Sequence, residues 1–332
     1  MTSLHHVAEE NLPLEPSYAA TWYACTGCMR CRTFCDHGNE VASALYAGRA
    51  ESVRARVEPA AARGVIARHA AREARAIAAA REALEGNGDA ASRASRTAPV
   101  AFVPGCTGPV VAPDDARATL DAVRAIDGRE VRVAAPSCCG LPLLEAGDRD
   151  GFMRAARRLL EDLRGAELAV FADPGCLHAM KRIAPSFGVA PPPGAELVHA
   201  VELAADRLAR VGRLGESLVA SDAPILYHDA CRLGRGLGTY DPPRLVLTRL
   251  LGRAPDEMHQ NRDRAECSGA GGQLPRTDPE AAAAIADERL AGAARDGRSV
   301  VVTACPAATR AFRKRGARAH DLMALVGETI AG

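Results

Sequence analysis

Four cysteines near the amino terminus constrain this chain more than any other feature. Cys25, Cys28, Cys31 and Cys35 follow the pattern C-x2-C-x2-C-x3-C. Cysteines three residues apart let the backbone wrap a cube of iron and sulfide, so that three thiolates reach three irons. Zinc ribbons and fingers usually place two ligand pairs about 12 to 20 residues apart, and this run lacks that separation. The run therefore predicts a [4Fe-4S] cluster held by these four residues, with zinc as the main alternative.

The fourth cysteine of the run departs from the ferredoxin pattern. Asp36 follows Cys35 where bacterial ferredoxin runs have proline, and in two-cluster ferredoxins the fourth cysteine ligates the other cluster. No second run of this kind occurs in the sequence. Cys35 is thus either the fourth ligand of its own cluster or a thiol whose partner the sequence does not show. Asp36 and His37 are alternative ligands, although a helix cap or a hydrogen bond to a ligand explains both more simply.

Length, charge and cysteine count limit the other classes of function. The 332 residues are 48% hydrophobic, which is enough for two ordinary domains or one large one. Lys+Arg 42 against Asp+Glu 41 gives a net charge of +1, so no overall field attracts nucleic acid. No apolar run approaches the roughly 18 residues of a membrane span, and the start of the chain has no signal-peptide pattern. Eleven cysteines without such a signal favour metal, cluster or catalytic thiols over disulfides. We expect a cytoplasmic protein without its own membrane span.

The composition divides the chain after the first cysteine run. Residues 39–85 are rich in alanine and arginine with apolar residues at helical spacing, which predicts two or three helices. Residues 86–99 contain glycine, serine, alanine and aspartate without periodicity, which is typical of a linker. We therefore expect a small all-helical domain with its linker at residues 1–95.

The other seven cysteines reveal a repeat. Two copies of one spacing are offset by about 125 to 129 residues, and short apolar runs such as VAFVPGC and PILYHDAC lead into the outer positions. Strands alternating with helices such as RDGFMRAARRLLEDLRG and DPEAAAAIADERLAGAARDG predict a mainly parallel α/β unit used twice about a pseudo-twofold axis, at 96–215 and 216–332. Three loops per copy then converge beyond the strand ends. The seven cysteines are Cys106, Cys138, Cys139, Cys176, Cys231, Cys267 and Cys305.

At these residues the chain resembles the cysteine-rich CCG-domain family, found in heterodisulfide reductase subunits B and C and in the iron-sulfur subunits of glycolate and lactate oxidation systems. The resemblance is strongest in YHDACRLGRGLGTYDPPR, NRDRAECSGAGG and VVTACPA, and it includes the ferredoxin-like amino terminus. It implies that a full copy has the form C…CC(G)…CxxC and holds a non-cubane [4Fe-4S] cluster or another metal. This chain departs from that pattern at Ala179, Ser268 and Ala308.

Those departures distinguish the two copies. The first copy keeps four thiols, Cys106, Cys138, Cys139 and Cys176, which suffice for an iron-sulfur cluster or a zinc site, with His178 as a further candidate ligand. The second copy keeps three thiols, Cys231, Cys267 and Cys305. Ser268 or His228 are candidates to complete it, although a strand-end histidine bonded to Asp229 or to backbone is the simpler interpretation of His228. A second copy with a purely structural role is an alternative.

The resemblance implies an iron-sulfur electron-transfer subunit, because the sequence contains no flavin or nicotinamide fingerprint of its own. The implied partner is a redox subunit such as a flavin-containing 2-hydroxyacid dehydrogenase, or a heterodisulfide-reductase-like assembly, and attachment to a membrane through that partner stays open. Two alternatives remain: a catalytic subunit that reduces a disulfide, and a zinc or iron-sulfur protein with a sensing or scaffold role. The predicted fold is a helical ferredoxin-like domain followed by a duplicated α/β cysteine-rich domain.

Overall fold

The structure, a computed structural model, describes residues 2–85, 98–134, 137–213, 223–291 and 299–331. The predicted linker falls almost wholly in 86–97, and the predicted boundary between the two copies falls in 214–222. Both predictions therefore lie outside the described residues.

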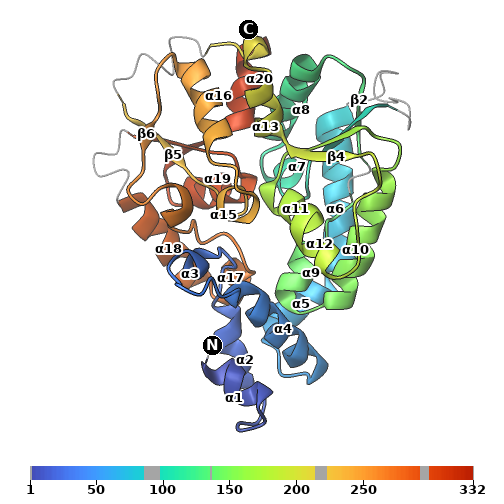
Figure 1. Ribbon diagram of the computed structural model, residues 1–332, viewed down its shortest axis with the longest axis vertical. Coiled ribbons are helices and arrows are strands. Elements are labelled where there is room, and N and C mark those ends of the chain that lie inside the picture. The colour runs from blue at the N-terminus through green and yellow to red at the C-terminus, as the bar shows by residue number, and fades with distance from the viewer. Residues whose placement is uncertain (1, 86–97, 135–136, 214–222, 292–298, 332) are drawn as a thin grey trace.

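Two parallel sheets of four strands each form the centre of the protein (Figure 1). The strand order is β2-β1-β3-β4 in one sheet and β6-β5-β7-β8 in the other, so the two sheets share one topology. Every strand pair in the described residues is parallel. The predicted α/β fold with a duplicated parallel sheet is confirmed. The strands are β1 Val100–Val103, β2 Val131–Val133, β3 Leu168–Phe171, β4 Glu196–His199, β5 Ile225–His228, β6 Asp256–Glu257, β7 Val300–Thr303 and β8 Arg318–Asp321.

The inner strands form because they are short runs of apolar residues that helices cover on both faces. All four residues are buried in each of β1, β3, β5 and β7, as expected for the centre of a parallel sheet. These are the runs that precede Cys106, Cys176, Cys231 and Cys305. The edge strands β4 and β8 instead alternate between exposed and buried residues.

Helices connect the strands within each copy. α10 and α18 lie within the two segments that the sequence predicted to be helical. The first copy contains α7 Gly108–Val111, α8 Pro113–Asp127, α9 Leu141–Ala146, α10 Arg149–Asp162, α11 Pro174–His178, η3 Ala179–Ile183, α12 Ala184–Ser186, α13 Ala200–Asp206 and η4 Leu208–Arg210. The second contains α15 Gly234–Leu237, α16 Asp241–Leu251, η5 Arg262–Arg264, α17 Leu274–Thr277, α18 Pro279–Ala291, α19 Pro306–Lys314 and α20 Leu322–Ala331.

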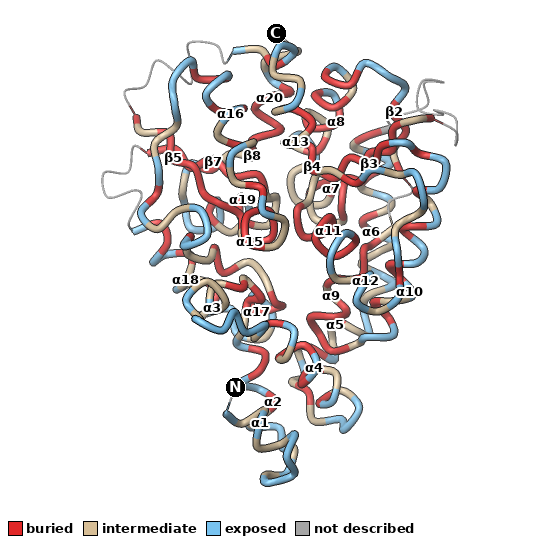
Figure 2. Tube along the Cα trace, in the orientation of Figure 1, coloured by how far each residue is buried: buried red, intermediate tan, exposed pale blue. Residues whose placement is uncertain are grey.

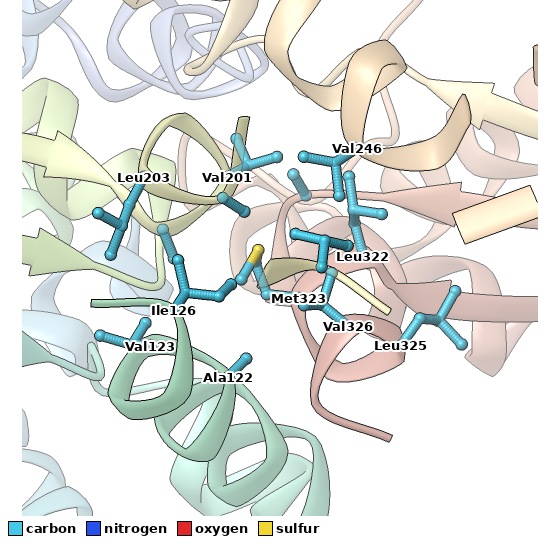
Figure 3. Packing of buried hydrophobic residues seen from close by; sticks show 14 of the residues in the cluster. Ala122, Val123, Ile126, Val201, Leu203, Val246, Leu322, Met323, Leu325 and Val326 are labelled. Atoms are coloured by element: carbon cyan, nitrogen blue, oxygen red, sulfur yellow. The ribbon is translucent and has the colours of Figure 1, made fainter. Parts of the chain in front are cut away.

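Four helices form the seam between the two copies. α8 of the first copy packs against α20 of the second, and α13 of the first packs against α16 of the second. Figure 3 shows Ile126 and Val201 of the first copy beside Met323 and Val246 of the second. Each fully buried aliphatic side chain contributes about 1.5–3 kcal/mol. One continuous apolar core therefore holds the two copies together.

Helices α1 to α4 lie beneath both sheets, whereas α6 runs upward beside the first copy (Figure 1). α4 and α5 pack against α9 of the first copy, while α3 packs against η5 and α5 against α17 of the second. Figure 2 shows that burial is concentrated in the sheets and the seam, and α1 contains no buried residue. The helices predicted at 39–85 are confirmed, whereas the ferredoxin-like character of this region stays a prediction. The helices are α1 Thr2–Ala8, α2 Pro16–Tyr23, α3 Arg30–Thr33, α4 Val41–Arg54, α5 Ala60–Ala67, α6 His69–Ala80 and η1 Arg81–Glu85.

Among the described helices, none combines the length and the apolar character that crossing a bilayer requires.

A buried histidine at the end of β4 predicts a pH dependence. Burial lowers the pKa of His199 to about 4, and its Nδ1 accepts a hydrogen bond from the backbone N–H of Val201 at 3.2 Å. In the unfolded chain the pKa is about 6.5, so the unfolded state binds the proton first as the pH falls. We expect His199 to lower the free energy of unfolding by up to about 1.4 kcal/mol per pH unit from pH 6.5 down to about 4.

The measurement is urea unfolding of the wild type and of His199→Asn at several pH values in this range. Asparagine keeps a side-chain acceptor at this helix N-cap but does not titrate. Burial also raises the pKa of Asp321 to about 7, which acts in the opposite direction but cancels between the two proteins. Parallel pH profiles for the two proteins would contradict the prediction.

Candidate metal centre

The first copy brings its four thiols together at the carboxyl ends of its strands. Cys106 follows β1, Cys138 and Cys139 follow β2, and Cys176 lies in α11 after β3. The thiols form a chain of hydrogen bonds, from Cys106 to Cys138, from Cys138 to Cys139 and from Cys139 to Cys176. Open α/β sheets hold their sites at this edge. The structure thus gathers the predicted residues, and their role as ligands stays a prediction.

Burial and mutual proximity disfavour the charged form of these thiols. The hydrogen bond with Cys138 is the main reason that the pKa of Cys106 is raised, and burial adds to it. A hydrogen bond from Cys139 lowers the pKa of Cys176, but burial and the nearby Asp173 outweigh it and raise the pKa to about 12. Several thiolates here would repel one another in a poorly solvated space. A bound cation that replaced the thiol protons would remove that repulsion.

Glycine N–H groups reach three of the candidate sulfur atoms. The N–H of Gly140 donates to Sγ of Cys138 at 3.4 Å. The same relation holds for Gly27 and Cys25 at 3.3 Å, and for Gly269 and Cys267 at 3.3 Å. Each glycine lies two residues after its cysteine and has a positive φ, which is +81° at Gly140. Such hydrogen bonds stabilise thiolates and tune the potential of clusters that thiolates hold.

A second group of thiols joins the amino-terminal run to the second copy. The thiols of Cys28 and Cys267 share a hydrogen bond, and Cys231 lies close enough to both for their charges to interact. Sγ of Cys267 also lies 3.4 Å from Oγ1 of Thr26. The hydrogen bond from Cys267 is the main reason that the pKa of Cys28 is lowered to about 5, whereas the pKa of Cys267 is raised. The two thiols, which come from segments far apart in the sequence, therefore lie side by side.

The cysteines of the amino-terminal run do not all face the same way. Burial, and then the charges of Cys25 and Cys28, raise the pKa of Cys31. Cys31 therefore lies close to these two residues. The Cys35 thiol instead accepts hydrogen bonds from the backbone N–H groups of its own loop, chiefly those of Asn39 and His37, which lower its pKa. His37 and Asp36 are both exposed. The structure thus brings three of the four predicted thiols together and directs the fourth into its own loop.

The other candidate ligands of the second copy are Cys305, His228 and Ser268, and each has its own environment. Cys305 follows β7, and burial followed by the charge of Asp173 from the first copy raises its pKa. His228 accepts a hydrogen bond at Nδ1 from Nε of Arg289 at 3.2 Å, and its ring packs edge-on against Phe312. The predicted side-chain partner Asp229 instead pairs with another residue. Its carboxylate lies 2.8 Å from the guanidinium of Arg244. Ser268 is buried.

A cavity of about 640 Å³ lies beside Met29, between α4, the first copy and α15. Its lining includes five arginines, Arg32, Arg149, Arg182, Arg232 and Arg235, against the two acids Glu40 and Glu51. His178 also lines it, and its Nδ1 lies 3.2 Å from Nη1 of Arg232. Burial, and then the charge of Arg232, lowers the pKa of His178 to about 3, so the ring is neutral at pH 7. The excess of positive charge suits an anionic small molecule.

Two arginines hold the thiol-bearing loops: the buried Arg235, which no sequence pattern marked, and the partly exposed Arg32. Arg235 donates to the carbonyl oxygens of Cys28, Asp263 and Ala265 at 2.7–2.8 Å, which ties the first run to the second copy. Arg32, next to Cys31, donates to the carbonyl oxygen of Arg235 at 2.8 Å. Carbonyl oxygens that accept from a guanidinium fix the backbone on both sides. The loops that carry Cys28 and Cys267 are therefore positioned independently of any ligand.

The donor chemistry of both thiol groups fits an iron-sulfur cluster. In the described part of the chain, no three or more His, Cys, Asp or Glu side chains are arranged around the position of a single ion. A cluster of four irons and four sulfides is wider and takes thiolates at its periphery. Both groups provide thiol donors, and glycine N–H groups reach three of the cysteines; most thiols of the first copy are buried, whereas Cys31 in the second group is exposed.

Several known proteins are similar to this chain in sequence. It is 29% identical over 204 residues to a subunit of the dihydromethanophenazine:CoB--CoM heterodisulfide reductase of Methanosarcina acetivorans, covering 58% of this chain and 49% of that protein. It is 27% identical over 208 residues to a subunit of the fumarate reductase (CoM/CoB) of Methanothermobacter marburgensis, covering 62% and 40%. It is 33% identical over 137 residues to "Probable iron-sulfur-binding oxidoreductase FadF" of Bacillus subtilis, covering 41% and 19%. The chain thus spans half or less of the length of these relatives.

The family model described as the cysteine-rich domain, CCG, matches residues 100–181 and 225–312. These two matches together cover more than half of the chain, and each contains the inner strands and the cysteine-bearing loops of one sheet. The chain belongs to the CCG cysteine-rich domain family.

Proposed function

We propose that this chain is an iron-sulfur electron-transfer subunit of a redox complex. The observation that carries the proposal is the gathering of thiols from distant segments into two groups, with glycine N–H groups directed at three of the sulfur atoms. Membership of the cysteine-rich domain family supports it. Two relatives named as reductase subunits and one named as an iron-sulfur-binding oxidoreductase support it further.

Two sets of residues would hold the cofactors. Cys25, Cys28 and Cys31 would provide three ligands of an amino-terminal [4Fe-4S] cluster. The four thiols of the first copy would hold a second iron-sulfur cluster, for which zinc is the alternative. A bound cluster supplies one-electron transfer. The protein's own part is to exclude water by burial, to direct N–H groups at sulfur and to fix the loops through Arg235.

The partner in this proposal is a redox subunit, with a flavoprotein dehydrogenase as the specific class. A carrier of single electrons needs a donor and an acceptor, and the chain has no flavin or nicotinamide fingerprint of its own. Association with a membrane would then occur through the partner.

The test is the content of iron, acid-labile sulfide and zinc per chain in protein purified without oxygen, with an EPR spectrum of the reduced sample. We expect about eight irons and eight sulfides, corresponding to two [4Fe-4S] clusters. About four of each would restrict the proposal to one filled group. Zinc without sulfide would contradict electron transfer and favour a sensing or scaffold role.

The arginine-lined cavity favours a second candidate function, the reduction of an anionic disulfide. Its five arginines lie beside Met29, the residue after Cys28. The test is consumption of a disulfide that carries carboxylate or sulfonate groups, supplied with an artificial electron donor. Activity that disappears in Arg182→Ala would support this candidate, and no turnover by the cluster-loaded protein would contradict it.

A further inference from the structure

We propose that Cys267 of the second copy, rather than Cys35, is the fourth ligand of the amino-terminal cluster, together with Cys25, Cys28 and Cys31. This inference rests on the proposed function, because it assigns a ligand to a cluster that the function requires. It joins two segments that are more than 200 residues apart in the sequence.

The cysteine spacing leaves one position of such a cluster to be filled. In a C-x2-C-x2-C-x3-C run the first three cysteines hold one cluster, while in two-cluster ferredoxins the fourth ligates the other. This chain contains only one such run, so the fourth ligand of the first cluster does not come from a second run. It must come from Cys35 or from a distant segment.

Contacts of the thiols point to the distant segment. The Cys267 thiol forms a hydrogen bond with the Cys28 thiol, and its Sγ lies 3.4 Å from Oγ1 of Thr26, within the first loop of the run. The Gly269 N–H donates to Sγ of Cys267 as the Gly27 N–H does to Sγ of Cys25. Cys267 therefore has the same backbone support as a member of the run.

Backbone packing holds the two loops together independently of the thiols. A Cβ at Gly271 would clash with the carbonyl oxygen of Thr26, and one at Gly272 would clash with that of Cys25. No side chain fits there, so two glycines let the loop after Cys267 touch the loop of Cys25. One guanidinium, that of Arg49, donates to the carbonyl oxygens of both Cys25 and Gly272, at 2.7 and 2.9 Å.

Cys35 has a different environment. Its thiol accepts from backbone N–H groups at Asn39, His37 and Gly38, and the residues from Asp36 to Glu40 around it are all exposed. To reach the other three thiols it would have to give up these hydrogen bonds. Cys267 requires no such change.

The second copy keeps only three thiols of its own, so one of them is available as a ligand of the amino-terminal cluster. Where the first copy has the adjacent pair Cys138 and Cys139, the second has Cys267 followed by Ser268. The charges of Asp173 and Cys231 act on Cys305, whereas none of the cysteines of the run is among the residues that shift its pKa. Cys231 is the nearest competitor, because it lies close to both Cys28 and Cys267.

The test compares three single variants of the full chain, Cys267→Ala, Cys35→Ala and Cys231→Ala, purified without oxygen beside the wild type. The readouts are iron and sulfide per chain and the EPR spectrum of the oxidised sample, in which a cubane that lacks one ligand gives a three-iron signal. We expect Cys267→Ala to lose about one iron and to show this signal, or to lose the whole cluster of about four irons. We expect Cys35→Ala and Cys231→Ala to keep the wild-type content.

Two further measurements separate ligand loss from misfolding. Far-UV circular dichroism of Cys267→Ala should match the wild type, and 2-mercaptoethanol added during reconstitution should restore the missing iron by providing a thiolate. Cys267→Ser should keep four irons with a changed EPR spectrum, because oxygen replaces sulfur at one iron. Failure of both the thiol and the serine to restore iron would overturn the assignment.

Each remaining outcome decides the question. Loss of iron in Cys35→Ala or Cys231→Ala, or unchanged iron in Cys267→Ala, would overturn the assignment and leave the proposed function intact. Absence of sulfide-bound iron in the wild type would overturn the proposed function and this assignment with it. The iron and sulfide content of the wild type therefore distinguishes failure of the ligand assignment from failure of the proposed function.

Discussion

Replacing Arg49 with methionine lowers the free energy of unfolding by about 3–5 kcal/mol. Arg49 is fully buried, and its guanidinium donates five hydrogen bonds to four carbonyl oxygens. Methionine fills most of the space but leaves these oxygens buried without a donor, and each such loss costs about 1–3 kcal/mol before the structure relaxes. The acceptors are Trp22 and Cys25 of the amino-terminal region, Glu145 of the first copy and Gly272 of the second.

The matched control for this change lies on the same helix. Arg54 is 77% exposed in its side chain and pairs with Glu51, so Arg54→Met should change the free energy of unfolding by no more than about 0.5 kcal/mol. Urea unfolding of both variants measures the difference. Equal and small effects of the two substitutions would contradict the role assigned to Arg49.

The second large effect concerns a buried ion pair between the two copies. Nη2 of Arg232 lies 2.9 Å from Oε1 of Glu145 and donates to the Tyr46 hydroxyl at 2.7 Å. Both charged side chains are less than a tenth exposed. Arg232→Met leaves the Glu145 carboxylate buried without its cation, and we expect this to cost about 3–5 kcal/mol.

The double variant Arg232→Met/Glu145→Gln tests the physical reason. Glutamine removes the uncompensated charge and keeps a carbonyl oxygen for the Gln273 amide, which donates to Glu145 at 3.1 Å in the wild type. We expect the double variant to be more stable in urea than Arg232→Met alone. A double variant as unstable as the sum of the two single variants would show that the buried charge is not the cause.

The sequence predicted those parts of the fold that are encoded locally. Apolar runs before Cys106 and Cys231 predicted inner strands, because strands buried on both faces need continuous apolar residues. The edge strands could not be predicted from apolar runs, since β6 has two residues and β8 begins with an exposed arginine. Helices rich in alanine were recognisable from propensity. The spacing of the cysteines alone predicted the repeat, without any assignment of strands.

The candidate site was predictable only within each copy. Spacing grouped Cys28 with Cys25, Cys31 and Cys35, whereas the structure places Cys28 against Cys267. No local pattern encodes a contact between such distant segments. The role of the buried arginines could not be predicted for another reason. The chain contains only two lysines, Lys181 and Lys314, so arginine is its general basic residue. In such a sequence a fully buried arginine looks like a solvent-exposed one.

The span of Arg49 contacts sets an order of events during synthesis. The Arg49 guanidinium cannot donate to the carbonyl oxygen of Gly272 until that residue, which lies 223 residues further along the chain, has been synthesised. At about 5–20 residues per second, a ribosome needs roughly 10–45 s to deliver that partner. During this interval the first cysteine run is outside the ribosome while the loop that closes over it has not been made. Delivery of a metal cofactor before translation ends would therefore meet a run of cysteines that still lacks the contacts of the second copy.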